Sequence, residues 1–152
     1  MKPLLCILIL FLSIGVGCSS RIEASNTSSA LDIRFYLAEE TANKGLIERC
    51  RPDSDQKIYL HPEPIVRTQD IIAASKAMGE FGQPVLMVSL NGSASERLFE
   101  ATKQHINKPA AIEVDGDIVV VATLRAALSH GFHIVAGWDA ETIDAMLKKL
   151  KQ

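Results

Sequence analysis

The chain has 152 residues, which is enough for one modest domain once any targeting segment has been removed. Apolar residues make up 47% and charged residues 22%, a balance that excludes a largely disordered chain. The formal net charge of −2 excludes the strongly basic surface with which proteins bind nucleic acids. We therefore expect no nucleic-acid partner.

The N-terminus predicts a signal peptide over residues 1–17. Lys2 precedes an apolar run from Pro3 to Ile14, and small residues follow it. The run is shorter than the roughly 20 residues that cross a bilayer, so a signal peptide is favoured over a permanent membrane span.

The segment Gly15-Val16-Gly17-Cys18 resembles the lipobox of bacterial lipoproteins. The resemblance implies cleavage before Cys18 and acylation of its thiol, so that a lipid anchor holds the protein to a membrane of the cell envelope. Gly15 departs from the pattern, which usually has Leu at that position. The alternative is an ordinary secretory signal followed by a coincidental cysteine.

Residues 18–30 are small and polar and show no periodicity, which predicts a flexible tether. We expect the folded part to be a single domain over residues 31–152.

The folded part begins with two predicted strands. Residues 31–37 alternate apolar and polar side chains, and residues 57–60 form a short run of strand-favouring residues that Pro62 and Pro64 end. Between them, residues 39–55 contain Gly45, Pro52 and many charges, which predicts a loop with a short helical turn.

The segment from Thr68 to Met78 is ambiguous from its residues alone. Ile71, Ala74, Ser75 and Met78 have helical spacing, and the alanine content favours a helix. The alternative is a helical turn through residue 73, followed by a strand over residues 74–78 that pairs with the next strand through a hairpin loop.

Residues 84–90 predict a central strand with apolar side chains on both faces. A helix follows over residues 94–106, with Ser93 as its N-cap and Glu96 completing a capping box. Its apolar face includes Leu98, Thr102 and His105.

The C-terminal part predicts a hairpin, a strand and a helix. Asp115-Gly116 between two strands, the second ending near residue 122, favours a two-residue turn with positive φ angles. A strand over residues 132–136 follows. Asp139 then caps a final helix over residues 139–150, with Trp138 placed to contact Ile143.

Candidate chemistry is sparse. His105, near the end of a helix face, is interpreted as a packed or capping side chain rather than a ligand. His130 and His133 flank Gly131 without helical metal-ligand spacing. Cys50 between two arginines and the pair Glu39-Glu40 are interpreted as a packed thiol and as solvated surface. We therefore predict no catalytic, cofactor or metal residues and no enzymatic activity, and the ligand-binding residues are unknown.

Three segments together resemble the head subdomain of the large periplasmic domain of SecD. They are residues 82–90 (GQPVLMVSL), 99–102 (FEAT) and 110–116 (AAIEVDG). Shorter similarities occur at residues 59–60, 68–71, 134–137 and 139–141, so that the likeness covers residues 57–150. The chain lacks a proline that the family has after Ala122.

The resemblance implies an α+β fold. It has a mainly antiparallel sheet and two principal helices, about residues 94–106 and 139–150. In the family, the stretch after the Asp-Ile turn enters a strand, so we predict a strand over residues 74–78.

The resemblance also implies a binding module at the extracytoplasmic side of a membrane that engages exported polypeptide or the export machinery. No cofactor is implied. The alternative is that the same fold binds another envelope protein or a small ligand, without a role in export.

Overall fold

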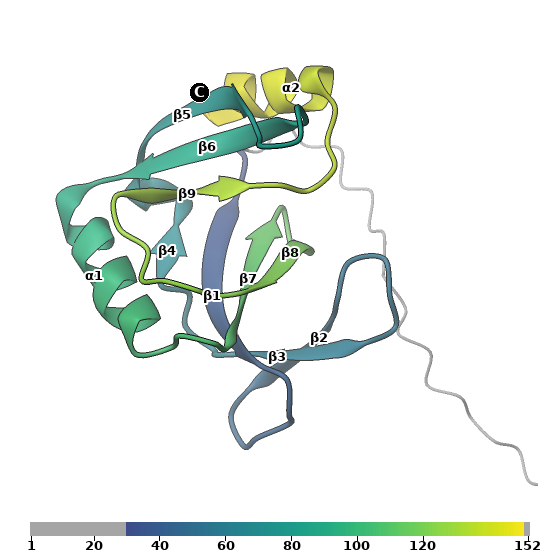
Figure 1. Ribbon diagram of the computed structural model, residues 1–152, viewed down its shortest axis with the longest axis vertical. Helices are drawn as coiled ribbons and strands as arrows, with labels where there is room; N and C mark the ends of the chain where they lie inside the picture. The colour runs from purple at the N-terminus through teal and green to yellow at the C-terminus, as the bar shows by residue number, and fades with distance from the viewer. Residues whose placement is uncertain (1–29, 151–152) are drawn as a thin grey trace, which may run out of the picture.

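The computed structural model describes residues 30–150 and shows the α+β fold that the sequence predicts (Figure 1). The predicted signal peptide over residues 1–17, the lipidation site Cys18 and nearly all of the predicted tether lie outside the described residues. Within residues 30–150, neither helix is long and apolar enough to cross a membrane.

The larger sheet has six strands, and every pairing in it is antiparallel. Its strand order is β2-β3-β1-β7-β8, with β4 also paired to β1. The strands are β1 Ile33–Glu39, β2 Ile47–Cys50, β3 Lys57–Leu60, β4 Val66–Arg67, β7 Pro109–Val114 and β8 Asp117–Thr123.

The smaller sheet has the order β5-β6-β9 and is also antiparallel. Its strands are β5 Ile71–Met78, β6 Pro84–Leu90 and β9 Gly131–Ile134. A short 3-10 turn, Thr68–Asp70, carries the chain directly from β4 of the larger sheet into β5 of the smaller one.

Two helices complete the fold of residues 30–150. Helix α1, Gly92–Lys103, buries Ala94, Leu98 and Thr102. Helix α2, Ala140–Leu150, lies against β5 and β6 and buries Ile143 completely. The backbone N–H of Thr142 donates to the side chain of Asp139 at 2.7 Å, which confirms the predicted cap of α2.

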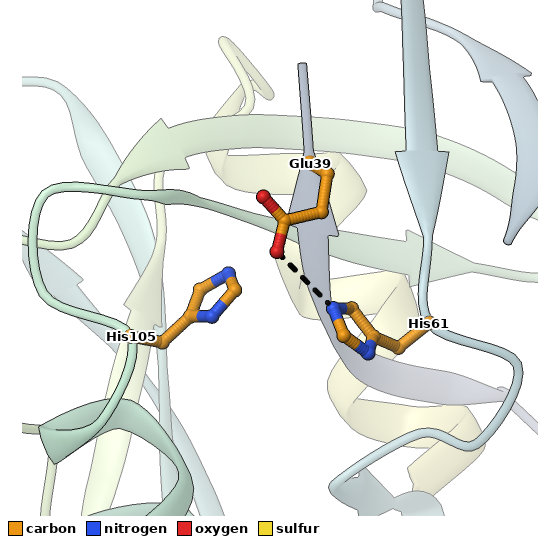
Figure 2. A group of neighbouring side chains, drawn as sticks. All are labelled: Glu39, His61 and His105. Carbon is orange, nitrogen blue, oxygen red and sulfur yellow. Dashed lines mark ion pairs between the residues drawn. The ribbon is translucent and has the colours of Figure 1, made fainter. Parts of the chain in front are cut away.

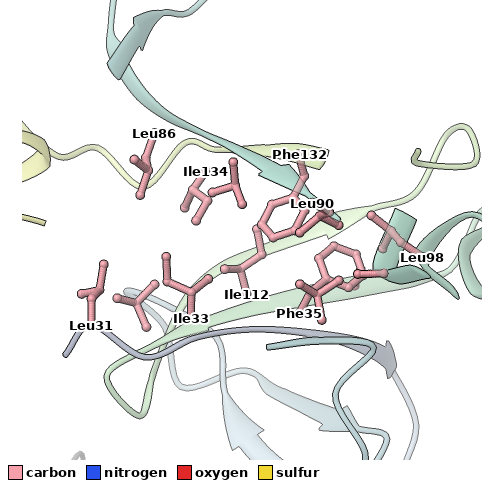
Figure 3. Close-up of a cluster of buried hydrophobic side chains, with 14 of the residues drawn as sticks. Leu31, Ile33, Phe35, Leu86, Leu90, Leu98, Ile112, Phe132 and Ile134 are labelled. Carbon is pink, nitrogen blue, oxygen red and sulfur yellow. The ribbon is translucent and has the colours of Figure 1, made fainter. Parts of the chain in front are cut away.

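The main hydrophobic core lies between the two sheets (Figure 3). It joins side chains of β1 and β7 from one sheet to side chains of β6 and β9 from the other. The labelled members are Leu31, Ile33, Phe35, Leu86, Leu90, Leu98, Ile112, Phe132 and Ile134. A second, smaller cluster gathers Tyr36, Ala38, Ile58, Leu60 and Ala111.

Most of the predicted elements are confirmed, with shifted ends. The strand predicted over residues 74–78 exists but starts earlier, at Ile71, and the helical alternative is wrong. The Asp115-Gly116 turn is confirmed by φ angles of 51° and 93°, as a type I′ turn requires. The predicted last strand lies at Gly131–Ile134 rather than at residues 132–136.

Two local predictions are wrong. The loop predicted over residues 39–55 contains β2, a four-residue strand that pairs with β3 along its whole length. The N-cap of α1 is Asn91 rather than Ser93, because the side chain of Asn91 accepts a hydrogen bond from the N–H of Ala94 at 2.8 Å. Glu96 is therefore beyond the first turn, and the helix ends at Lys103 rather than at residue 106.

Candidate functional site

An open groove of about 680 Å³ lies between β8 and β9. We call it the groove. Its lining comes from both sheets and from the connection between β8 and β9, and it includes Phe35, Met87, Val120, Ala122, Phe132 and His133. Most of these side chains are apolar, and the volume lies within the usual range for ligand-binding sites of about 300–1,000 Å³.

Both strands that flank the groove are edge strands. Among the described residues, β8 pairs only with β7, and β9 pairs only with β6. The outer side of an edge strand presents backbone N–H and C=O groups that can pair with another extended chain. The groove therefore combines an apolar lining with backbone groups that an added strand could use.

The floor of the groove is held by aromatic packing. The rings of Phe35 in β1 and Phe132 in β9 lie with their centroids 5.3 Å apart and tilted by 47°. Both side chains are buried and belong to the main core. Because these two strands come from different sheets, the contact fixes the spacing of the sheets at the base of the groove.

The connection between β8 and β9 is tied to α1. The hydroxyl of Thr102 accepts a hydrogen bond from the N–H of Leu128 at 2.9 Å and donates one to the carbonyl of Leu98 at 2.7 Å. Thr102 is fully buried. This contact holds one wall of the groove in place.

The structure brings His130 and His133 to the groove, where both are exposed. Nδ1 of His130 lies 3.1 Å from the hydroxyl oxygen of Ser129. Neither histidine belongs to a group of three potential metal ligands within residues 30–150. Cys50 ends β2 at the opposite edge of the larger sheet, half-buried and already engaged in an interaction, which gives no support to a role as a nucleophile.

A second polar cluster joins Glu39, His61 and His105 (Figure 2). Glu39 ends β1, His61 follows β3, and His105 follows α1. The register of β1 and β3 brings Glu39 and His61 close, since Glu39 faces Tyr59 and the N–H of His61 donates to the carbonyl of Leu37. We call this group the His–Glu cluster.

Electrostatics within the cluster favour an ionised Glu39. Burial raises the pKa of Glu39, but the ammonium group of Lys108, 3.0 Å from Oε1, lowers it more, with help from the two histidines. The net effect is a pKa below the ordinary value for a glutamate. Glu39 therefore carries a negative charge between two imidazole rings.

Sequence reasoning found only part of this cluster. His105 is buried, with Nε2 2.9 Å from the carbonyl oxygen of Ala38, which agrees with the interpretation as a packed side chain. Glu39 was interpreted as solvated surface, but only 25% of its side chain is exposed. His61 was not singled out, because nothing in its local sequence indicates that β1, β3 and the end of α1 meet beside it.

The fold and the groove define an α+β domain with two facing antiparallel sheets and an open apolar groove at one side. Residues 41–150 match the model of the SecDF P1 head subdomain family. The chain belongs to this family.

Sequence relatives agree with this assignment, and solved structures share the fold. The chain is 24% identical over 123 residues to the protein translocase subunit SecD of Aquifex aeolicus and 26% identical over 101 residues to the protein translocase subunit SecDF of Thermus thermophilus. Its fold is similar to a structure described as a membrane component SecDF that enhances protein export, with a TM-score of 0.64 at 17% identity. It is also similar to SecDF in a super-membrane-facing form, with a TM-score of 0.61 at 21% identity.

The chain spans only a minor part of the length of the translocase subunits that it matches. The matches cover 76% and 62% of this chain but only 25% of the Aquifex protein and 14% of the Thermus protein. The two structural matches cover 82% and 80% of this chain, and 63% and 18% of the matched chains. The similarity to the solved structures concerns the fold alone.

Proposed function

We propose that this chain is a binding module of the cell envelope that captures extended apolar segments of exported polypeptides in the groove. The observation that carries the proposal is the groove itself, with an apolar lining between two strands whose outer edges are unpaired within the described residues. The proposal is for binding without catalysis and without a nucleic-acid partner.

Strand addition suits partners of varied sequence. An extended segment can pair its backbone with β8 or β9 whatever its side chains are, while alternate apolar side chains enter the groove. An unfolded polypeptide offers such segments, whereas a folded one has already buried them. The named relatives are protein translocase subunits, and this supports a partner from protein export, either the exported chain or a component of the machinery.

The proposal includes a lipid anchor on Cys18. Its support is the sequence alone, namely the apolar run before Gly15 and the small residues that lead to Cys18. Acylation would hold the groove near the membrane through which the partner emerges. Mass spectrometry of the mature N-terminus tests this, and a Cys18 that is unmodified, or joined to Cys50 in a disulfide, would refute the anchor while leaving the groove proposal standing.

A matched pair of variants tests the groove. Met87 lies in the groove and is 37% exposed, whereas Phe81 lies in the β5–β6 hairpin, outside the groove, and is 91% exposed. Met87→Glu places a charge among apolar side chains and should weaken binding about tenfold, or about 1.4 kcal/mol. Phe81→Glu should leave binding unchanged.

The measurement is the fluorescence anisotropy of a labelled secretory precursor that is held unfolded, titrated with the full chain. Photo-crosslinking from position 133 should capture the same precursor, and crosslinking from position 48 in β2 should not. Equal affinity of the wild-type and Met87→Glu chains, or no binding by either, would overturn the proposal. Crosslinks to Sec components alone would assign the groove to the machinery rather than to the exported chain.

The second candidate is a small apolar ligand. The volume of the groove favours it, because about 680 Å³ is also the size of a pocket for a small molecule. In that case an environment-sensitive apolar dye should bind in the groove and should not be displaced by the unfolded precursor. A deletion strain would then show an envelope defect with normal secretion.

A further inference from the structure

We propose that Glu39, His61 and His105 form a binding site for one divalent transition-metal ion of the Zn²⁺ type. This inference concerns the His–Glu cluster and does not depend on the function of the groove. Among residues 30–150, it is the group in which three potential ligands converge, since one ligand atom from each residue lies within 4.8 Å of the others.

The spacing is close to what a metal requires. Oε1 of Glu39 and Nε2 of His61 are 3.6 Å apart, and two ligands of a tetrahedral ion with bonds of about 2.0–2.1 Å are separated by about 3.4 Å. The two imidazole rings lie edge to face with centroids 5.7 Å apart and an interplanar angle of 84°. The three side chains approach one another from three separate segments of the chain (Figure 2).

One ligand atom lacks a partner. Nε2 of His61 is buried and makes no hydrogen bond, because 3.6 Å to Glu39 is longer than a hydrogen bond. A buried polar nitrogen without a partner is uncommon and calls for an explanation such as a bound ion. A metal ion between His61 and Glu39 satisfies this nitrogen.

The ring of His105 is fixed by the protein. Its Nε2 lies 2.9 Å from the carbonyl oxygen of Ala38, and a carbonyl can only accept, so in this contact Nε2 carries the proton. Histidine ligands typically donate one ring N–H to a backbone carbonyl in this manner, which sets the tautomer and orients the ring. The neutral ring then keeps its lone pair on Nδ1.

The donor set selects the class of ion. Two imidazoles and one carboxylate suit Zn²⁺ and its first-row neighbours, whereas Ca²⁺ and Mg²⁺ require mainly oxygen ligands. Three protein ligands leave at least one position of the ion for water or a partner. The site lies where β1, β3 and α1 end, so a bound ion links three elements that are distant in sequence.

Lys108 allows a specific test of metal binding by Glu39. Its ammonium group lies 3.0 Å from Oε1 of Glu39 and competes with a cation for the same carboxylate. Its side chain is 52% exposed, so that Lys108→Met leaves the fold intact. Removing this charge should tighten the binding of a metal about two- to fivefold.

The experiment is a titration of the metal-free full chain, purified without a histidine tag, with ZnCl₂ in a calorimeter. We expect one ion per chain, a higher unfolding temperature with zinc, and no binding of MgCl₂ or CaCl₂. CoCl₂ should give the visible absorption bands of tetrahedral cobalt. His61→Gln and Glu39→Gln should each weaken binding at least tenfold.

His130→Gln and His133→Gln are the matched controls, since both remove an exposed imidazole outside the cluster, and they should bind zinc as the wild type does. The proposal is overturned if the wild type takes up no zinc at 100-fold excess over the protein. It is also overturned if His61→Gln binds as tightly as the wild type, or if Lys108→Met weakens binding.

Discussion

The space between the two sheets is covered by the chain on one side and open to solvent on the other. On one side the chain passes from β4 directly into β5, and α2 covers β5 and β6 (Figure 1). On the other side β8 and β9 are edge strands with the groove between them. We call these the covered side and the groove side.

Comparing the burial of side chains on the two sides shows which side contributes more to the free energy of unfolding. Fully buried side chains such as Leu86, Ile134 and Ile143 meet on the covered side and in the centre, whereas Val120 and Ala122 in the groove remain partly accessible. Burial of apolar surface drives folding, so the covered side should carry most of the stability. The groove side should tolerate substitutions that alter binding.

The largest expected effect separates the two sides directly. Ile143→Ala removes a side chain that is 0% exposed beneath α2 and should cost about 3 kcal/mol of unfolding free energy, because it leaves a cavity. Val120→Ala removes a smaller, half-buried side chain beside an existing hollow and should cost less than about 1 kcal/mol. Urea denaturation followed by the single tryptophan, Trp138, measures both.

Equal losses in these two variants would contradict the comparison. A loss near 1 kcal/mol for both would mean that α2 contributes little to the core. A loss near 3 kcal/mol for both would mean that the groove side is as tightly packed as the covered side.

Gly131 holds β9 close to β6 on the groove side. It begins β9, and a Cβ atom at this position would collide with the carbonyl of Val88 in β6, well inside 3.0 Å. Gly131→Ala should therefore push β9 away from β6, cost about 2 kcal/mol, and weaken binding in the groove. The measurements are urea denaturation and the precursor titration.

Gly92→Ala is the matched control. Gly92 is the first residue of α1, and a Cβ atom there would meet no heavy atom within 4 Å. Alanine also favours helix, so this variant should be unchanged or more stable by up to about 1 kcal/mol. If Gly131→Ala were as stable as Gly92→Ala and bound the precursor equally well, the close approach of β9 to β6 would not be needed for the shape of the groove.

The covered side also contains a polar link that should make stability depend on pH. Asp70, 7% exposed, accepts hydrogen bonds from the backbone N–H of Arg67 at 3.0 Å and from the guanidinium of Arg97 in α1 at 2.9 Å. Burial raises the pKa of Asp70, but these two partners lower it more, so that it lies below the ordinary value. Asp70→Asn should cost about 1.5 kcal/mol at pH 7.

The sign of the pH dependence follows from this shift. A carboxyl group with a depressed pKa in the folded state stabilises the protein fully above the ordinary aspartate pKa of about 4. This contribution is lost as the pH falls through the lower pKa of the folded state. The difference between wild type and Asp70→Asn should therefore shrink below about pH 4, whereas Asp144→Asn, at an exposed carboxylate, should show little difference at any pH.

Local chemistry explains which elements could be predicted. The Asp115-Gly116 turn and the Asp139 cap depend on neighbouring residues, and both are confirmed. Strand β2 was missed because Glu48 and Arg49 are exposed and only its pairing with β3 makes the segment a strand. The residues of β5 favour a helix, but pairing with β6 overrides that preference.

The sites were harder to predict than the fold. The strands that line the groove were found, but no sequence pattern shows that β8 and β9 leave a hollow between them. The His–Glu cluster draws on positions 39, 61 and 105, which meet only because β1 pairs with β3 and α1 ends beside them. Convergence of distant residues is a property of the tertiary structure.

The smallest expected effect concerns the cap of α1, for which sequence and structure give different answers. The side chain of Asn91 accepts from the N–H of Ala94, whereas the hydroxyl of Ser93 accepts only from the guanidinium of the exposed Arg97. Asn91→Ala should therefore cost about 1 kcal/mol, and Ser93→Ala should change stability by less than about 0.5 kcal/mol. A larger loss of stability for Ser93→Ala than for Asn91→Ala would mean that Ser93, and not Asn91, is the N-cap of α1.

This last pair also tests whether stability and binding are separable. Leu98 of α1 is fully buried in the core, so a weaker cap loosens α1 and lowers the free energy of unfolding. The hydrogen bond from Leu128 that ties the groove to α1 ends at Thr102, near the other end of the helix from Asn91. Asn91→Ala should thus lower stability in urea while the precursor titration stays unchanged, which is the opposite of the result expected for Met87→Glu.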